Sequence, residues 1–63
     1  MKLKGYKRYE DFKTVTFESD AGYQVEFDIW NDGDIKVETD GVKLTEIKEC
    51  IAIIESGKLE IIL

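Results

Sequence analysis

The sequence predicts a small single α+β domain with the element order β-β-β-α-β, in which one helix packs on a mainly antiparallel sheet. Three observations support this prediction. Apolar and polar residues alternate through residues 13–19, 23–30 and 35–38, a period of two that is typical of strands with one buried face. Two short connections that end in glycine separate these segments. Apolar residues then recur at helical spacing between residues 44 and 54.

The register of the second hairpin follows from its loop, Asn31-Asp32-Gly33. A two-residue turn places Ile29 opposite Lys36 and breaks the apolar face, because a one-residue slip turns every side chain over. A three-residue loop closed by a left-handed Gly33 instead places Ile29 opposite Ile35. The same register sets Asp28 opposite Lys36, which is a modestly favourable pair. We therefore expect the three-residue loop.

The first hairpin shows the same pattern around Asp20-Ala21-Gly22. A three-residue loop places Ser19 opposite Tyr23 and Phe17 opposite Val25, with the apolar residues of both strands on one face. Together, the two hairpins predict a three-stranded meander within residues 13–43.

The ends of the chain give weaker signals. In residues 1–12, Leu3, Tyr6, Tyr9 and Phe12 recur every third residue, which fits neither a regular strand nor a helix. We expect an extended segment or short strand there, followed by a turn near Tyr9–Phe12. Residues 58–63 alternate again and predict a C-terminal strand. A domain this small is marginally stable alone, and this apolar segment is the expected seam of a homodimer.

The helix is predicted over residues 45–56, with Thr45 as its N-cap and Gly57 as the residue that ends it. The predicted core shares one property, apolar side chains on the buried face of a strand or helix. It consists of Val15, Phe17, Tyr23, Val25, Phe27, Ile29, Ile35, Val37, Leu44, Ile47, Ile51, Ile54, Leu59, Ile61 and Leu63. Cys50 falls on the apolar stripe of the helix and is expected to be buried and inert.

Composition argues against an enzyme. The chain has 63 residues, one cysteine and no histidine, so it lacks an intramolecular disulfide and the commonest catalytic base and metal ligand. No catalytic set, phosphate-binding loop, metal site or cofactor motif is recognisable. No apolar run is long enough to span a membrane, and no signal peptide is visible, which favours a cytoplasmic protein.

Charge is distributed unevenly along the chain. Residues 1–13 hold five basic and two acidic residues, so the net charge of this segment is +3. Residues 14–63 hold four lysines and twelve acidic residues, so the net charge of this segment is −8. Such asymmetry bears on partners and solubility and says nothing about the fold.

The acidic part of the chain provides the first candidate site. Its members are polar residues of the solvent face of the sheet and of the adjoining loop: Glu18, Glu26, Asp28, Trp30, Asp32, Asp34 and Glu38. We interpret them as a surface that presents carboxylates as a nucleic-acid backbone presents phosphates. The simpler interpretation is a solvated sheet face. Trp30 is either an exposed interface residue or is covered by Tyr6 and Tyr9 of the N-terminal segment.

The basic N-terminal segment provides the alternative site, for nucleic acid. Basic and aromatic residues interleave in it: Lys2, Lys4, Tyr6, Lys7, Arg8 and Tyr9. Such a set can bind single-stranded nucleic acid through phosphate contacts and base stacking. The simpler interpretation, an edge strand protected by lysines, is favoured because the acidic body would repel nucleic acid.

The sequence therefore favours a small acidic, non-enzymatic binding protein that occludes a partner protein, as an inhibitor that presents a carboxylate-rich sheet face in place of nucleic acid. The alternatives are direct nucleic-acid binding and a structural subunit of a homo-oligomer.

Overall fold

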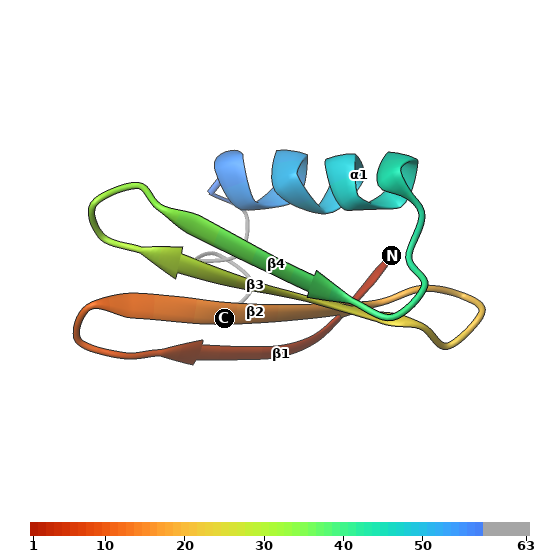
Figure 1. Cartoon of the computed structure of the whole chain (residues 1–63), viewed down its shortest axis with the longest axis horizontal. Helices are drawn as coiled ribbons and strands as arrows, with labels where there is room; N and C mark the ends of the chain where they lie inside the picture. The colour runs from red at the N-terminus through yellow and green to blue at the C-terminus, as the bar shows by residue number, and fades with distance from the viewer. Residues whose placement is uncertain (58–63) are drawn as a thin grey trace.

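The computed structural model describes residues 1–57. Within this range it contains four strands, β1 (Lys2–Arg8), β2 (Phe12–Glu18), β3 (Gln24–Trp30) and β4 (Ile35–Thr39), and one helix, α1 (Leu44–Glu55). The strands form one antiparallel sheet in chain order, β1-β2-β3-β4, and α1 lies over one face of it (Figure 1). The small α+β class is therefore confirmed. The C-terminal strand expected at 58–63 lies outside the described residues.

Both predicted hairpin registers are confirmed. Ile29 pairs with Ile35 and Phe27 with Val37 across β3 and β4. Phe17 pairs with Val25 across β2 and β3, and the Ser19 N–H donates to the Tyr23 carbonyl at 2.8 Å. The glycines that close the loops are left-handed, with φ of 91° at Gly22 and 100° at Gly33. The loop glycines thus determine which face of the sheet each side chain occupies.

The N-terminal segment forms a full seven-residue strand and adds a fourth member to the meander. A bulge between Leu3 and Gly5 shifts its register: Leu3 pairs with Phe17, whereas Tyr6 pairs with Val15. Three residues of β1 therefore match two residues of β2, and Leu3 and Tyr6 both face the helix. This extra residue explains the three-residue spacing of Leu3 and Tyr6; Tyr9 lies in the turn that follows β1.

The helix begins earlier than predicted, and Thr45 is not its N-cap. Lys43 holds that position in extended backbone geometry, and its carbonyl accepts hydrogen bonds from the N–H groups of Glu46 and Ile47, both at 3.0 Å. The Glu46 carboxylate in turn accepts the Lys43 N–H at 3.5 Å. A carboxylate that reaches back to the first backbone donor replaces the hydroxyl cap that Thr45 was expected to supply. Gly57, with φ of 75°, follows the helix as predicted.

The core lies between α1 and the middle of the sheet. Its buried members are Val15, Phe17, Val25, Phe27, Val42 and Cys50. The Phe17 and Phe27 rings meet edge to face with centroids 6.0 Å apart. Ile29, Ile47, Ile51 and Ile54 are partly buried against this cluster. Val42, in the loop before α1, was not predicted, and Cys50 is buried as expected.

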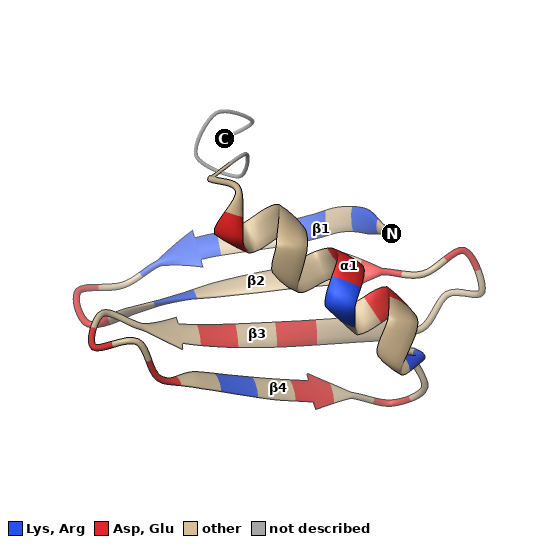
Figure 2. Cartoon of the chain, turned by 90° about the horizontal axis from the view of Figure 1, so that it is seen from above, with Lys and Arg blue, Asp and Glu red and all other residues tan. Residues whose placement is uncertain are grey.

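Four predicted core residues are exposed instead: Tyr23, Ile35, Val37 and Leu44, with exposed fractions of 48%, 50%, 40% and 66%. The helix starts beside the end of β4 and crosses the sheet diagonally toward β1 (Figure 2). It therefore covers the centre of the sheet and leaves much of the inner side of β4 open. The remaining predicted core residues, Leu59, Ile61 and Leu63, lie outside the described residues.

Replacing Gly33 with alanine is expected to lower the free energy of unfolding by about 1–2 kcal/mol, because a Cβ strains left-handed backbone geometry. Urea unfolding monitored by circular dichroism measures this change. Gly5→Ala is the matched control, since Gly5 has no positive φ and its Cβ would lie 3.9 Å from the Thr16 Cβ. Equal losses in the two variants would contradict the role assigned to the loop glycine.

Candidate interaction surface

The face of the sheet opposite α1, called here the outer face, collects the polar residues of the strands. From the pairing of the strands, its members are Lys2, Lys4, Lys7, Phe12, Thr14, Thr16, Glu18, Gln24, Glu26, Asp28, Trp30, Lys36 and Glu38. No helix of residues 1–57 covers this face (Figure 1). All the strand residues predicted for the acidic site therefore share one open surface.

Three aromatic rings, called here the aromatic stack, lie at one end of the outer face. The Phe12 ring stacks between those of Tyr9 and Trp30, with centroid distances of 4.6 Å and 5.1 Å. Trp30 is thus half-buried, and its cover is Phe12, while Tyr9 at the end of the stack is 42% exposed. Tyr6 does not cover Trp30, because it faces the core.

Phe12 was missed as a site residue. The signal was present in the sequence: extending the predicted strand by one residue places Phe12 opposite Trp30, and the structure shows that pair.

The two hairpin turns that carry the stack are linked by Asn31. Its backbone N–H donates to the Asp11 carbonyl, and its side-chain Nδ2 donates to the Glu10 carbonyl, both at 3.0 Å. These bonds tie the β3–β4 turn to the β1–β2 turn. The stack is therefore held in place before any partner binds, which reduces the entropy lost on binding.

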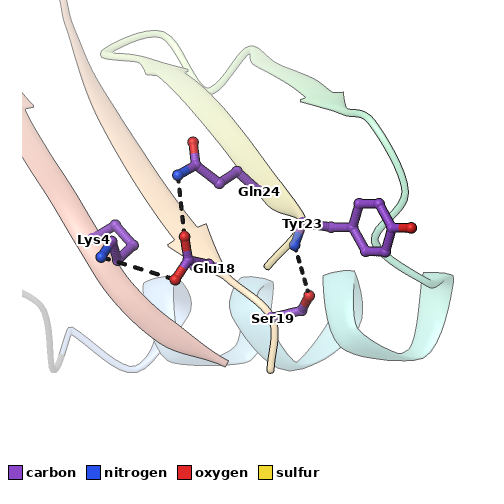
Figure 3. A network of polar contacts seen from close by, with 5 residues as sticks. All are labelled: Lys4, Glu18, Ser19, Tyr23 and Gln24. Atoms are coloured by element: carbon purple, nitrogen blue, oxygen red, sulfur yellow. Dashed lines mark hydrogen bonds and ion pairs between the residues drawn. The ribbon is translucent and has the colours of Figure 1, made fainter. Parts of the chain in front are cut away.

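Glu18 connects three strands at the other end of the outer face (Figure 3). Its carboxylate lies 3.8 Å from the Lys4 Nζ on β1 and accepts a hydrogen bond from the Gln24 side chain on β3 at 3.3 Å. Nearby, the Ser19 hydroxyl accepts the Tyr23 N–H at 3.2 Å. Glu18 is thus engaged within the molecule and presents less negative charge than the sequence suggested.

The middle of the outer face carries the remaining acidic rows. Glu26 lies opposite Glu38, and Asp28 lies opposite Lys36, as the sequence predicted. The Asp28 carboxylate accepts a hydrogen bond from the Thr14 hydroxyl at 3.1 Å. Lys36 pairs with Glu38 at 2.9 Å, and this contact raises the pKa of the lysine. Glu26 and Asp28 thus form an acidic row along β3, four and two residues before Trp30 on the same face, and Lys36 of β4 interacts electrostatically with both (Figure 2).

The two loop aspartates have structural roles in the turn, Asp32 through its carboxylate and Asp34 through its backbone. The Asp32 side chain accepts the Asp34 N–H at 3.1 Å, and the Asp34 carbonyl accepts the Trp30 N–H at 2.9 Å. Among residues 1–57 no group of three or more cysteine, aspartate or glutamate side chains is arranged to hold a metal ion.

The predicted basic site is divided between two faces. Lys2, Lys4 and Lys7 belong to the outer face, whereas Tyr6 and Arg8 lie on the side of the helix. The Lys7 ammonium sits 5.1 Å from the centroid of the Tyr9 ring, a cation–π contact. The structure therefore joins part of the basic segment to the aromatic stack, a combination that the sequence did not reveal.

A hollow of about 460 Å³ opens at this end of the sheet. Its lining consists of Arg8, Tyr9, Glu10, Phe12, Lys13, Ile29, Trp30 and Asn31. Aromatic edges beside cationic side chains can receive a planar or anionic group. Two further shallow hollows border Trp30 and the row of Glu26.

Cys50 stands apart from these surfaces. It is completely buried beneath the helix, and burial raises the pKa of its thiol, since a thiolate is poorly solvated there. It therefore resembles a core residue and not a nucleophile.

Comparison with protein-family models, curated proteins and solved structures finds no match to this chain. In the described part of the chain, no helix has both the length and the apolar character needed to cross a membrane.

Replacing Phe12 with leucine is expected to shift the fluorescence of Trp30 to longer wavelength and to increase its quenching by iodide. The chain has a single tryptophan, which makes the reading unambiguous. Loss of the two ring contacts should also lower the free energy of unfolding by about 0.5–1.5 kcal/mol per pair. Tyr23→Leu is the control, because Tyr23 lies at the opposite end of β3. An unchanged spectrum in Phe12→Leu would be inconsistent with the stack.

The neutral thiol of Cys50 is expected to make stability pH-dependent. Because its folded pKa is raised above the ordinary 9.0, its stabilising contribution is complete below pH 9.0 and is lost as pH rises through the folded pKa. Urea unfolding at intervals from pH 8 to 10.5 should show this decline. Cys50→Ala should be less stable throughout but should lack this part of the slope; identical slopes would refute the assignment.

Proposed function

We propose that this protein is a small, non-enzymatic binding protein that occupies a site on a partner protein with its outer face. The contact surface consists of the aromatic stack and the row of Glu26 and Asp28 beside it. The partner is a protein with a basic surface, of the kind that otherwise binds nucleic acid. The predicted cytoplasmic location and self-association belong to this proposal.

The observation that carries the proposal is the half-exposed Trp30, which lies next to carboxylates on a sheet face that no helix of residues 1–57 covers. Tryptophan contributes disproportionately to interface energy when it is surrounded by groups that exclude water. Here Phe12 lies on one side of the ring, and the turn bonds of Asn31 fix the position of the strand end. Because the surface is preorganised, little binding energy is lost in ordering it.

The chemistry of this surface favours an arginine-rich partner. A guanidinium group stacks on aromatic faces and also forms paired hydrogen bonds to a carboxylate. Trp30 and Asp28 lie on the outer face of the same strand, two residues apart, so neighbouring cationic groups of a partner can contact both. The ion pairs of Glu18 with Lys4 and of Glu38 with Lys36 reduce the charge at the margins. We therefore propose that Glu26 and Asp28, and not the whole acidic face, take the place of nucleic-acid phosphates in the partner's binding site.

Affinity capture with the tagged protein, with and without nuclease, tests the proposal. The double reversal Glu26→Lys/Asp28→Lys is expected to abolish retention of the partner protein that the unmodified chain retains, and Trp30→Ala should weaken it strongly. The matched control is Glu49→Lys/Glu55→Lys, which changes the net charge equally on the exposed side of α1. Circular dichroism of each variant verifies the fold.

Retention of the same protein by the sheet-face variant and by the helix control would refute the proposed surface. Loss in the sheet-face variant alone, together with release by salt, supports it.

Direct binding of single-stranded nucleic acid is the second candidate, and one observation favours it. Lys7 contacts Tyr9 of the aromatic stack, so a cation and a stacking surface are adjacent. In the same capture experiment this function predicts retained nucleic acid that nuclease removes. It also predicts that Lys7→Glu weakens retention, whereas the reversal at Glu26 and Asp28 strengthens it. Opposite responses to that reversal therefore distinguish the two functions.

A further inference from the structure

The two edges of the sheet differ in how open they are. At β1 the strand is bulged between Leu3 and Gly5 and carries four cationic residues, both of which discourage pairing with another strand. β4 has no bulge, since its ladder with β3 is regular, and its one cation, Lys36, is paired with Glu38 of the same strand; all five of its residues are exposed. Within residues 1–57, β4 has only one neighbouring strand. Within the described residues, the sheet therefore has one protected edge and one open edge.

The direction of the backbone groups of β4 follows from its hairpin. The Trp30 N–H donates to the Asp34 carbonyl at 2.9 Å, so this pair is hydrogen-bonded. Hydrogen-bonded and non-hydrogen-bonded pairs alternate along an antiparallel ladder. The N–H and C=O groups of Lys36 and Glu38 therefore point toward β3. Those of the alternate residues Ile35, Val37 and Thr39 point toward the open edge.

We propose that β4 pairs antiparallel with β4 of a second copy of this chain, about a two-fold axis at Val37, so that the four described strands of each copy join in one continuous sheet. This register places Val37 opposite its own copy and Ile35 opposite the second copy's Thr39. The outward-facing backbone groups of Ile35, Val37 and Thr39 then all form hydrogen bonds with the second copy. In this register the two β4 strands lie side by side over their full length, Ile35–Thr39. A shift of two residues either way keeps the hydrogen-bonding pattern but overlaps only three residues of the strand.

Among the residues of the strand itself, Ile35–Thr39, charge favours the same register. Pairing about Val37 sets Lys36 opposite Glu38 of the other copy, twice per dimer. A shift one way brings two copies of Lys36 together. A shift the other way brings two copies of Glu38 together, and it sets Lys36 opposite Asp40, which lies beyond the end of the strand. Opposite charges directly across strands are favourable, whereas like charges are not. The existing contact of Lys36 with Glu38 becomes part of a ring of four alternating charges.

The apolar side of β4 supports a partner on this edge. Ile35 and Val37, left open by the diagonal helix, are 50% and 40% exposed. Pairing continues the inner side of the sheet, so the Val37 side chains of the two copies meet and Ile35 gains a neighbour. One cost accompanies the register, because Asp34 comes opposite Asp40 at each end. The dimer seam predicted from the sequence, residues 58–63, is thus replaced in this proposal by β4.

Sedimentation velocity over a wide range of protein concentration tests the proposal, which requires a reversible dimer. Lys36→Glu and Glu38→Lys should each raise the dimer dissociation constant about tenfold, because each puts two like-charge pairs in place of two opposite ones. The exchange variant Lys36→Glu/Glu38→Lys should recover the original value. Rescue of this kind excludes a general loss of folding as the cause.

Mixing the two single variants gives the decisive measurement. One variant presents two glutamates and the other two lysines, so they should form a heterodimer in preference to either homodimer. Glu55→Lys, at the end of α1 that lies away from β4, is the control and should leave the dimer unchanged (Figure 2). A monomer at all concentrations, or a dimer whose dissociation constant changes in neither Lys36→Glu nor Glu38→Lys, would overturn the proposal.

Discussion

The structure depends on the register that the two glycine-closed hairpin loops impose. Left-handed geometry at Gly22 and Gly33 allows three-residue loops, and these place Phe17 opposite Val25 and Ile29 opposite Ile35. A shift by one residue would move the apolar rows to the outer face and the carboxylates against the helix. Core and candidate interface are therefore two results of one constraint.

Much of the fold was predictable because this constraint is local. Alternation and loop length determine the pairing of β2, β3 and β4 without reference to the rest of the chain. The N-terminal strand was harder, since its bulge changes the apparent period, and a bulge leaves no simple mark in a single sequence. The start of α1 was misplaced because a hydroxyl at Thr45 looked like a cap. Instead, the Glu46 side chain reaches back to the backbone of Lys43.

The alternation of apolar and polar residues does not determine which strand residues the helix buries or which side chains meet in the candidate interaction surface. The direction in which α1 crosses the sheet decides that Val25 and Phe27 are buried while Ile35 and Val37 are open. The outward position of Trp30 was predictable, but its neighbour Phe12 was assigned to an irregular segment. Side-chain pairing also changed the electrostatics: Glu18, counted as a free carboxylate in the sequence, bridges Lys4 and Gln24. Sequence reasoning locates charges, whereas their effective strength depends on neighbours.

The bulge of β1 has a consequence for the size of any assembly. In the proposed pairing through β4, both outer edges of the joined sheet belong to β1, since the two-fold axis leaves the same strand at either end. These edges are irregular and cationic, so neither is a suitable template for another strand. Assembly would therefore stop at the dimer. Each monomer has an open edge at β4, but the dimer closes it, so strand pairing would not continue into fibrils.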